Sequence, residues 1–234
     1  MIKAKNIYKS IGQNQILQDI SLELSKGVIN ILFGPSGSGK TALCRRLSLL
    51  DNPDKGELEI FENNYSFPNN LKKQVLPYPQ IGFVYQQLFL WPHLTNKQNI
   101  LLALGKKADE HINQFKELNQ LLEIENVIDR YPNEISIGQK QRVAIARALI
   151  LNPSFVFLDE ITSALDIVQT KQIGNILLDL KAKGIGVLMI THNIEYFKEI
   201  ADNFIFLSNG NIKEQGTKSI FTNPKSVELN KFLK

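Results

Sequence analysis

Short apolar runs separated by polar turns divide the chain into strands and helices. Most of the strand-like runs are short and rich in Val, Ile, Leu and Phe, which favours β-structure. They occupy residues 16–24, 28–33, 57–61, 81–85, 155–158, 187–190 and 204–207. Helical periodicity is found at residues 41–50, 113–123, 139–150 and 167–182. This alternation predicts an α/β fold whose mainly parallel sheet is covered by helices on both faces.

One long segment interrupts the alternation. Strand signals vanish between residues 88 and 151, where helical periodicity dominates. We therefore expect a single domain over residues 1–234, in which 1–87 and 152–234 form the α/β core and 88–151 a helical subdomain. Near the end, Asn209-Gly210 lies between two strand-like runs and predicts an antiparallel hairpin. Residues 217–234 are expected to form a helical tail on the surface.

Composition and charge exclude several classes of protein. The 234 residues are 43% hydrophobic and 21% charged, as is typical of globular domains. The net charge of +4 comes from basic side chains spread along the chain, so we expect no nucleic-acid partner. The only cysteine, Cys44, permits no intrachain disulfide and suits a reducing compartment. No apolar run approaches the ~18 residues that a membrane-spanning helix needs.

A glycine-rich turn joins the run at 28–33 to the helix that follows. Its residues match G-x-x-x-x-G-K-[ST] in full: Gly34, Pro35, Ser36, Gly37, Ser38, Gly39, Lys40 and Thr41. In a turn of this kind the backbone N–H groups cradle phosphates, Lys40 bridges the β- and γ-phosphates, and the Thr41 hydroxyl holds Mg²⁺. The other interpretation is an ordinary Gly/Ser connecting loop, which the strand before it and the helix after it disfavour.

A second pattern places two acidic residues at the end of a strand-like run. The apolar run at 155–158 ends in Asp159 and Glu160. Asp159 is placed to reach a Mg²⁺ ion, and Glu160 to polarise an attacking water. Taken alone, these acids also fit an ordinary strand-end turn. Gln86 and His192 follow other strand-like runs, and the carboxyl ends of parallel strands meet at one sheet edge, so we expect all four side chains to converge there.

The order of the motifs resembles the ATP-binding cassette (ABC) family over nearly the whole chain. The motifs are the phosphate turn, Tyr85-Gln86, Ser136-Ile137-Gly138-Gln139, the strand ending in Asp159-Glu160, Ser163-Ala164-Leu165-Asp166, and Thr191-His192. A guanine-reading Asn-Lys-x-Asp is not found, because the nearest string, 96–99, ends in Asn. The resemblance implies a P-loop NTPase (RecA-like) core with an antiparallel β subdomain and a helical subdomain.

The resemblance also implies roles for individual residues. Gln86 would contact Mg²⁺ or the attacking water, and His192 the γ-phosphate. Tyr8 would stack on adenine, although an exposed strand aromatic is the other interpretation. Asp166 would cross the interface of a head-to-tail dimer. In that dimer each ATP would lie between the phosphate turn of one chain and the Ser136, Gly138 and Gln139 turn of its partner.

Two residues depart from the family pattern. Ile137 replaces a glycine, and Ile161 stands where proline usually follows the Asp-Glu pair. Ser136 and Gln139 form a capping-box pattern, which predicts a helix with Ser136 as its N-cap and Ile137 as its first residue. Because that position has helical dihedrals and needs no glycine, we expect the isoleucine to be tolerated. Gly138 is retained for close approach to a phosphate.

The segment 83–95 and the tail resemble the ATPase subunits of polar amino-acid importers, especially those for arginine. This implies ATP and Mg²⁺ as cofactors, a second ATPase subunit, integral-membrane permease subunits, and indirectly a periplasmic or extracellular solute-binding protein. The expected location is the cytoplasmic face of the inner (cell) membrane. Trp91, Pro92 and His93 fit equally well as packing residues or as part of a groove for the permease.

Two other functions stay open at this point. One is a soluble cassette that acts on ribosomes or DNA, although such proteins usually carry two cassettes or a long coiled-coil insertion. The other is a non-hydrolysing partner in a heterodimer, which the departures at Ile137 and Ile161 would permit.

Overall fold

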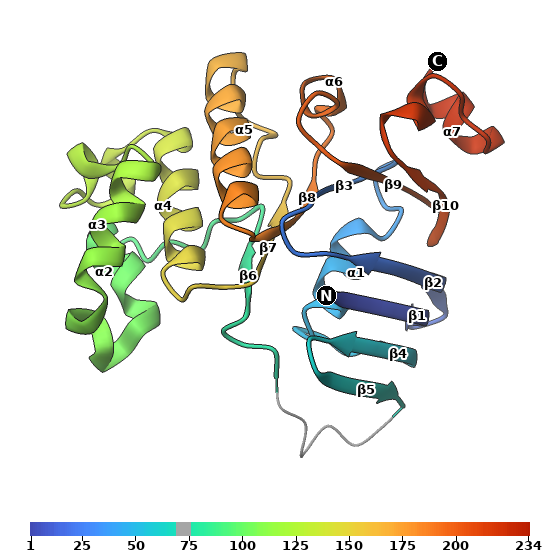
Figure 1. The fold of residues 1–234 in the computed structure, drawn as a ribbon, viewed down its shortest axis with the longest axis horizontal. Coiled ribbons are helices and arrows are strands. Elements are labelled where there is room, and N and C mark those ends of the chain that lie inside the picture. The colour runs from blue at the N-terminus through green and yellow to red at the C-terminus, as the bar shows by residue number, and fades with distance from the viewer. Residues whose placement is uncertain (69–75) are drawn as a thin grey trace.

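The computed structural model describes residues 1–68 and 76–234, which form two sheets and a group of helices (Figure 1). The strands are β1 Ile2–Ile11, β2 Asn14–Leu24, β3 Ile29–Phe33, β4 Lys55–Ile60, β5 Asn63–Phe67, β6 Ile81–Val84, β7 Phe155–Asp159, β8 Gly186–Ile190, β9 Asn203–Ser208 and β10 Asn211–Gly216. The α-helices are α1 Lys40–Leu47, α2 Asn96–Leu101, α3 Ile112–Leu121, α4 Ile137–Leu149, α5 Ile167–Ala182, α6 Ile194–Phe197 and α7 Val227–Phe232.

The larger sheet has the strand order β10-β9-β3-β8-β7-β6. Five of its strands are parallel, and β10 alone runs antiparallel, paired with β9. Every residue of β3, β7 and β8 is buried, as expected for parallel strands covered on both faces. The predicted parallel sheet is therefore confirmed. So is the hairpin, since Asn209 and Gly210 both have the positive φ that a tight two-residue turn requires.

The smaller sheet is antiparallel, with the order β2-β1-β4-β5. Helix α1 buries Leu43, Cys44 and Leu47 in a core shared by both sheets. Arg46 of the same helix is also buried, and its guanidinium donates to the carbonyl of Ala42. The helix is therefore packed on most of its sides, which holds the turn that precedes it.

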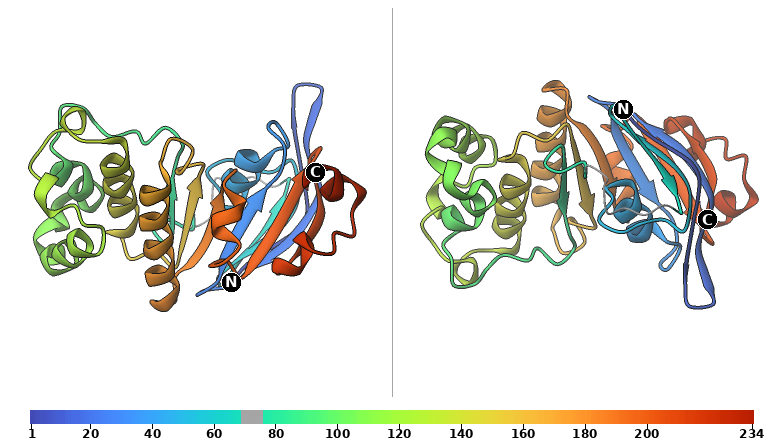
Figure 2. Two further views of the ribbon diagram at one scale, coloured as in Figure 1. Left: turned by 90° about the horizontal axis from the view of Figure 1, so that it is seen from above. Right: turned by 90° about the horizontal axis from the view of Figure 1, so that it is seen from below.

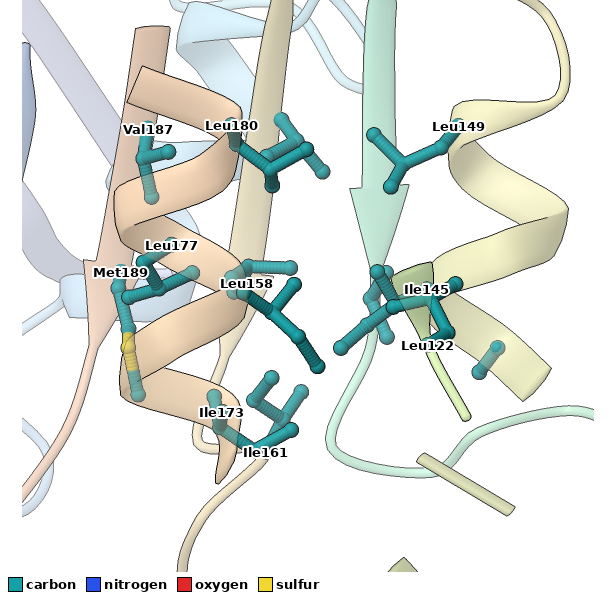
Figure 3. Close-up of a cluster of buried hydrophobic side chains, with 14 of the residues drawn as sticks. Leu122, Ile145, Leu149, Leu158, Ile161, Ile173, Leu177, Leu180, Val187 and Met189 are labelled. Atoms are coloured by element: carbon teal, nitrogen blue, oxygen red, sulfur yellow. The ribbon is translucent and has the colours of Figure 1, made fainter. Parts of the chain in front are cut away.

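Helices α2, α3 and α4 stand together at one end of the molecule (Figure 1). Their apolar faces belong to the same core as α5 and the larger sheet. In Figure 3, Ile145 and Leu149 project from α4 toward the sheet, and Leu177 and Leu180 of α5 cover the neighbouring strands. The segment that breaks the strand–helix alternation is thus continuous with the core through α4.

The C-terminal tail, residues 217–234, is more buried than expected. It forms a short 3₁₀ turn, Lys218–Phe221, and then α7, in which Leu229 is fully buried. The Phe232 ring lies 5.3 Å from that of Phe206 and 6.1 Å from that of Phe33 (centroid to centroid). The tail therefore covers the end of β3 rather than lying loosely on the surface. Within residues 1–68 and 76–234, no helix is both long and apolar enough to cross a membrane.

Candidate active site

The glycine-rich turn lies between β3 and α1 and is built around close backbone approaches. Gly34 has φ 147°, and a Cβ at this position would lie 1.9 Å from the carbonyl oxygen of Leu207. Gly39, with φ 103°, is the N-cap of α1. Any larger residue at Gly34 would displace the neighbouring strand end. The cradle therefore needs glycine for steric as well as conformational reasons.

Lys40 is folded back into this turn. Its Nζ donates to the carbonyl oxygens of Gly34 (3.0 Å) and Pro35 (2.9 Å), and the residue is 5% exposed. Burial lowers the pKa of the Lys40 ammonium, while the nearby Glu160 and Asp159 carboxylates raise it. Neutral carbonyls are weak partners for a buried cation, so an incoming phosphate oxygen would be a stronger acceptor for the same protons.

Thr41 and Asp159 form a second pair at the turn. The Thr41 hydroxyl donates to Oδ1 of Asp159 at 3.2 Å, and Asp159 is 4% exposed. Burial raises the pKa of the Asp159 carboxyl, and the hydrogen bond from Thr41 partly offsets that rise. A hydroxyl and a carboxylate are hard oxygen donors of the kind that Mg²⁺ takes alongside phosphate oxygens and waters. The residues present therefore fit a magnesium ion bound together with a nucleotide.

Glu160 lies at the centre of the convergence. Its Oε2 accepts a hydrogen bond from Nε2 of Gln86 at 3.2 Å, and its Oε1 lies 2.9 Å from Nε2 of His192. These side chains follow β7, β6 and β8, three neighbouring strands of one sheet. Glu160 also has φ 48°, an uncommon conformation for a residue with a side chain. The structure thus brings together Gln86, Asp159, Glu160 and His192 at one sheet edge.

Ile161 follows Glu160, at the position where the family usually has proline. It is 1% exposed and packs beside Ile173 of α5 (Figure 3). Together with the Glu160 amide, which donates to the carbonyl of Ile190, this packing fixes the turn after β7. The buried Ile161 side chain restrains this turn by packing, whereas a proline ring would restrain it through the backbone.

The Ser136 turn begins α4 as the sequence predicts. Ser136 is the N-cap, its hydroxyl accepts from the Gln139 amide at 3.3 Å, and the Gln139 side chain accepts from the Ser136 amide at 2.9 Å. Ile137 is the first helical residue and is 44% exposed. A Cβ on Gly138 would lie 3.1 Å from the side chain of Gln169. The turn is an intact capping box despite the isoleucine.

Asp166 lies next to this turn rather than next to Lys40. It caps α5 by accepting from the Gln169 amide at 2.7 Å. Across residues 1–68 and 76–234, no hydrogen bond or ion pair joins Ser136, Gly138, Gln139 or Asp166 to the turn at 34–41. Figures 1 and 2 place α5 between α4 and α1. One chain therefore carries two separate clusters of predicted site residues.

Tyr8 lies on β1 and is partly exposed, and its carbonyl accepts from the Asp54 amide at 2.8 Å. The pairing of β1 with β2 is irregular between Ile7 and Lys9, so the alternation of side chains is interrupted at this residue. The contact between Tyr8 and an adenine ring stays a prediction.

Sequence reasoning missed one residue that positions the site. Arg147 of α4 donates to the carbonyl oxygens of Leu88 (2.6 Å) and Phe89 (2.7 Å), just after Gln86. Burial lowers the pKa of this guanidinium. The only signal in the sequence was a charged residue on the otherwise apolar, alanine-rich end of a helix.

Comparison with known proteins agrees with this geometry. Residues 17–163 match the family model described as ABC transporter. The arginine transport ATP-binding protein ArtP of Haemophilus influenzae is 38% identical over 239 residues, which cover 99% of this chain and 98% of the relative. The chain belongs to the ABC transporter family. As an ABC protein it is an ATP-binding subunit of the ATPase class, and its P-loop NTPase fold is confirmed.

Other ABC proteins show the same likeness over their full length. The arginine transport ATP-binding protein ArtM of Bacillus subtilis is 38% identical, with 100% of this chain and 98% of the relative covered. Among solved structures, the dimeric ABC transporter cassette MJ0796 superposes with a TM-score of 0.79 at 30% identity, covering 93% of this chain and 99% of that one. The ADP conformation of the cassette MJ1267 gives a TM-score of 0.85 at 25% identity, with 98% of each chain covered.

Proposed function

We propose that this ABC subunit hydrolyses ATP and couples ATP-driven dimer closure to the import of a small polar solute. The observation that carries the proposal is the position of Glu160, held by Gln86 and His192 beside the Thr41–Asp159 pair. A carboxylate held in place next to a phosphate cradle is suited to orienting and polarising a water. A binding-only partner in a heterodimer would not need that arrangement.

The cofactors of the proposed reaction are ATP and Mg²⁺. Residues 34–41 bind the phosphates, and Thr41, Asp159 and Gln86 would hold the magnesium ion. When bound, the ion would neutralise charge on the phosphoryl group. Lys40 supplies fixed positive charge, and Glu160 accepts a proton from the attacking water. His192 would donate a hydrogen bond toward the γ-phosphate.

The dimer follows from the separation of the two clusters within one chain. Residues 1–87 and 152–234 form the core that carries the phosphate turn, and residues 88–151 form the helical unit that carries Ser136, Gly138 and Gln139. In a head-to-tail pair, the capping-box turn of one chain closes over the nucleotide of the other, with Asp166 crossing between them. A helix N-terminus offers free N–H groups and a positive dipole end to phosphate. The dimeric cassette MJ0796 supports this assembly.

The permease contact is proposed for the segment that follows Gln86. Phe89 and Trp91 are 60% and 52% exposed, and the Tyr85 and Phe89 rings lie 5.5 Å apart. Exposed aromatics anchored by Arg147 form a firm apolar surface for a helix of an integral-membrane partner. Movement at that contact reaches Glu160 through Gln86. The subunit would then lie at the cytoplasmic face of the cell membrane and meet a solute-binding protein only indirectly.

The proposed solute is a polar or basic amino acid such as arginine. Support comes from relatives named for arginine and L-cystine transport and import, and for glutamate transport, at 37–38% identity over nearly the full chain. The assignment of the solute rests on the relatives and not on the geometry of the site.

Replacement of the central carboxylate tests the hydrolytic role. Glu160→Gln keeps the shape of the side chain and its contacts to Gln86, but cannot accept a proton. We expect ATP binding within about threefold of the unmodified chain and a fall in the hydrolysis rate of about 100-fold or more. Phosphate release measured on both proteins would decide; undiminished hydrolysis would remove Glu160 from its role.

Reconstitution with its co-purifying permease tests the transport role. We expect ATPase activity in proteoliposomes to rise when the solute-binding protein and a basic or polar amino acid are supplied. A panel of amino acids, with sugars as controls, would identify the solute. If no amino acid stimulates hydrolysis, the importer assignment is wrong, whereas co-purification with ribosomes or DNA would favour the soluble cassette.

A further inference from the structure

A buried asparagine, Asn99, holds the segment that leads into α2. The residue is 0% exposed, its Oδ1 accepts from the Trp91 amide at 2.7 Å, and its Nδ2 donates to the Trp91 carbonyl at 3.1 Å. The same Nδ2 lies 3.1 Å from the carbonyl oxygens of Leu94 and Thr95. Burial of an amide costs free energy unless its hydrogen bonds are made. The buried position of Asn99 and the path of residues 91–95 therefore depend on each other.

The helix that carries Asn99 is itself fixed at its start. The Thr95 side chain caps α2, and the amides of Asn96 and Lys97 donate to carbonyl oxygens in the segment 128–130, both at 2.8 Å. Helix α2 also packs against α4 (Figure 1). The Asn99 side chain therefore projects from a fixed support, and residues 91–95 take their position from it.

Two side chains hold the segment after Gln86, one near each end. Arg147 donates to two carbonyl oxygens at its start, whereas Asn99 bonds to both the N–H and the C=O of Trp91. Because both polar groups of that peptide backbone are held, the direction in which the Trp91 side chain leaves the chain is fixed as well. Along the segment, partly buried leucines alternate with exposed aromatics, in the order Leu88, Phe89, Leu90 and Trp91.

We propose that Asn99 is a positioning residue for the permease contact, which holds Trp91 outward as the main contact for a helix of the membrane partner. This proposal rests on the proposed function. Trp91 is 52% exposed, and its ring meets that of His93 edge-on, with 5.7 Å between the centroids. A large aromatic side chain that is already ordered loses little entropy on binding, and such side chains often dominate the binding energy of an interface. Without Asn99, Trp91 would have to be ordered at each encounter.

The fluorescence of Trp91 tests the first half of the proposal, because Trp91 is the only tryptophan in the chain. Asn99→Leu keeps the approximate shape of the side chain and removes its hydrogen bonds. Since 52% of Trp91 is exposed when it is held, we expect its acrylamide-quenching constant to rise by up to about twofold on release. Asn96→Leu is the matched control, since Asn96 is also 0% exposed on α2 but donates to the Val127 carbonyl, outside the segment. It should leave the quenching unchanged.

Proteoliposomes that contain the co-purifying permease test the second half. The ratio of permease-stimulated to basal ATP hydrolysis should fall at least about tenfold in Asn99→Leu and in Trp91→Ala, and stay within about twofold in Asn96→Leu. The double variant at positions 91 and 99 should have the same ratio as Trp91→Ala, because both substitutions act on one contact.

Equal quenching in Asn99→Leu and Asn96→Leu would overturn the proposal, and so would increased quenching in Asn99→Leu with an unchanged ratio. If Asn99→Leu does not fold, Asn99→Ser enters the same comparison, since a smaller side chain also removes the hold on Trp91. A permease that fails to stimulate even the unmodified chain would contradict the proposed function. Stimulation that is present in the unmodified chain and retained in Asn99→Leu would contradict only the role of Asn99.

Discussion

At the residue scale, Ile137 is the departure from the family pattern in the turn that begins α4. Ile137 has helical dihedrals and keeps its backbone N–H, and its side chain is partly exposed. We therefore expect Ile137→Gly to change the ATPase rate by less than about tenfold, or ~1.4 kcal/mol in the barrier. Steady-state phosphate release checks this.

Val227→Gly is the control for that substitution, since Val227 occupies the same first position after a serine cap in α7. It should share the propensity cost of glycine without any effect on hydrolysis. A gain far above tenfold at position 137 alone would show that the isoleucine blocks the site and would revive the non-hydrolysing interpretation.

At the scale of elements, the C-terminal helix stabilises the strand that leads into the phosphate turn. Leu229 is fully buried, and Phe232 contacts Phe33 at the end of β3. We expect Leu229→Ala to lower the free energy of unfolding by about 2–5 kcal/mol, because it leaves a cavity under α7. Urea unfolding measures the change. The exposed neighbour Leu233 should cost less than about 0.5 kcal/mol when replaced by alanine; equal costs would mean that the tail is not docked.

The elements predicted from the sequence are those with strong local signals. Buried strands such as β7 and β8 are continuous apolar runs, and the capping-box pattern at Ser136 marks the start of α4. Two strands were missed for local reasons. In β1, a bulge around Asn6, which has φ 49°, breaks the alternation. In β5 only Tyr65 is buried.

Prediction of the candidate site from sequence has the same limit: only residues with a strong local signal were found. Gln86, Asp159, Glu160 and His192 were found because each follows a strand whose end lies at one edge. The position of Arg147 depends on how α4 packs against the segment after Gln86, which no local pattern encodes. The role of Tyr8 rests on the resemblance alone, because no local pattern encodes the irregular pairing of β1 with β2 around it.

At the scale of the molecule, the predicted site residues form two clusters that no hydrogen bond or ion pair joins within residues 1–68 and 76–234. The phosphate turn and Glu160 belong to the sheet edge, whereas Ser136 caps α4 and Asp166 caps α5. A second copy, turned head to tail, would complete each site. In the proposed dimer, ATP would be part of the interface and its hydrolysis would open that interface.

The mass of Glu160→Gln in solution tests this account most directly. Light scattering after size exclusion should show a single chain, 26.5 kDa, without nucleotide, and twice that mass with Mg²⁺–ATP. With Mg²⁺–ADP it should remain a single chain, because the bridging γ-phosphate is absent. A protein that binds ATP at saturation and yet stays at the mass of one chain would contradict the account.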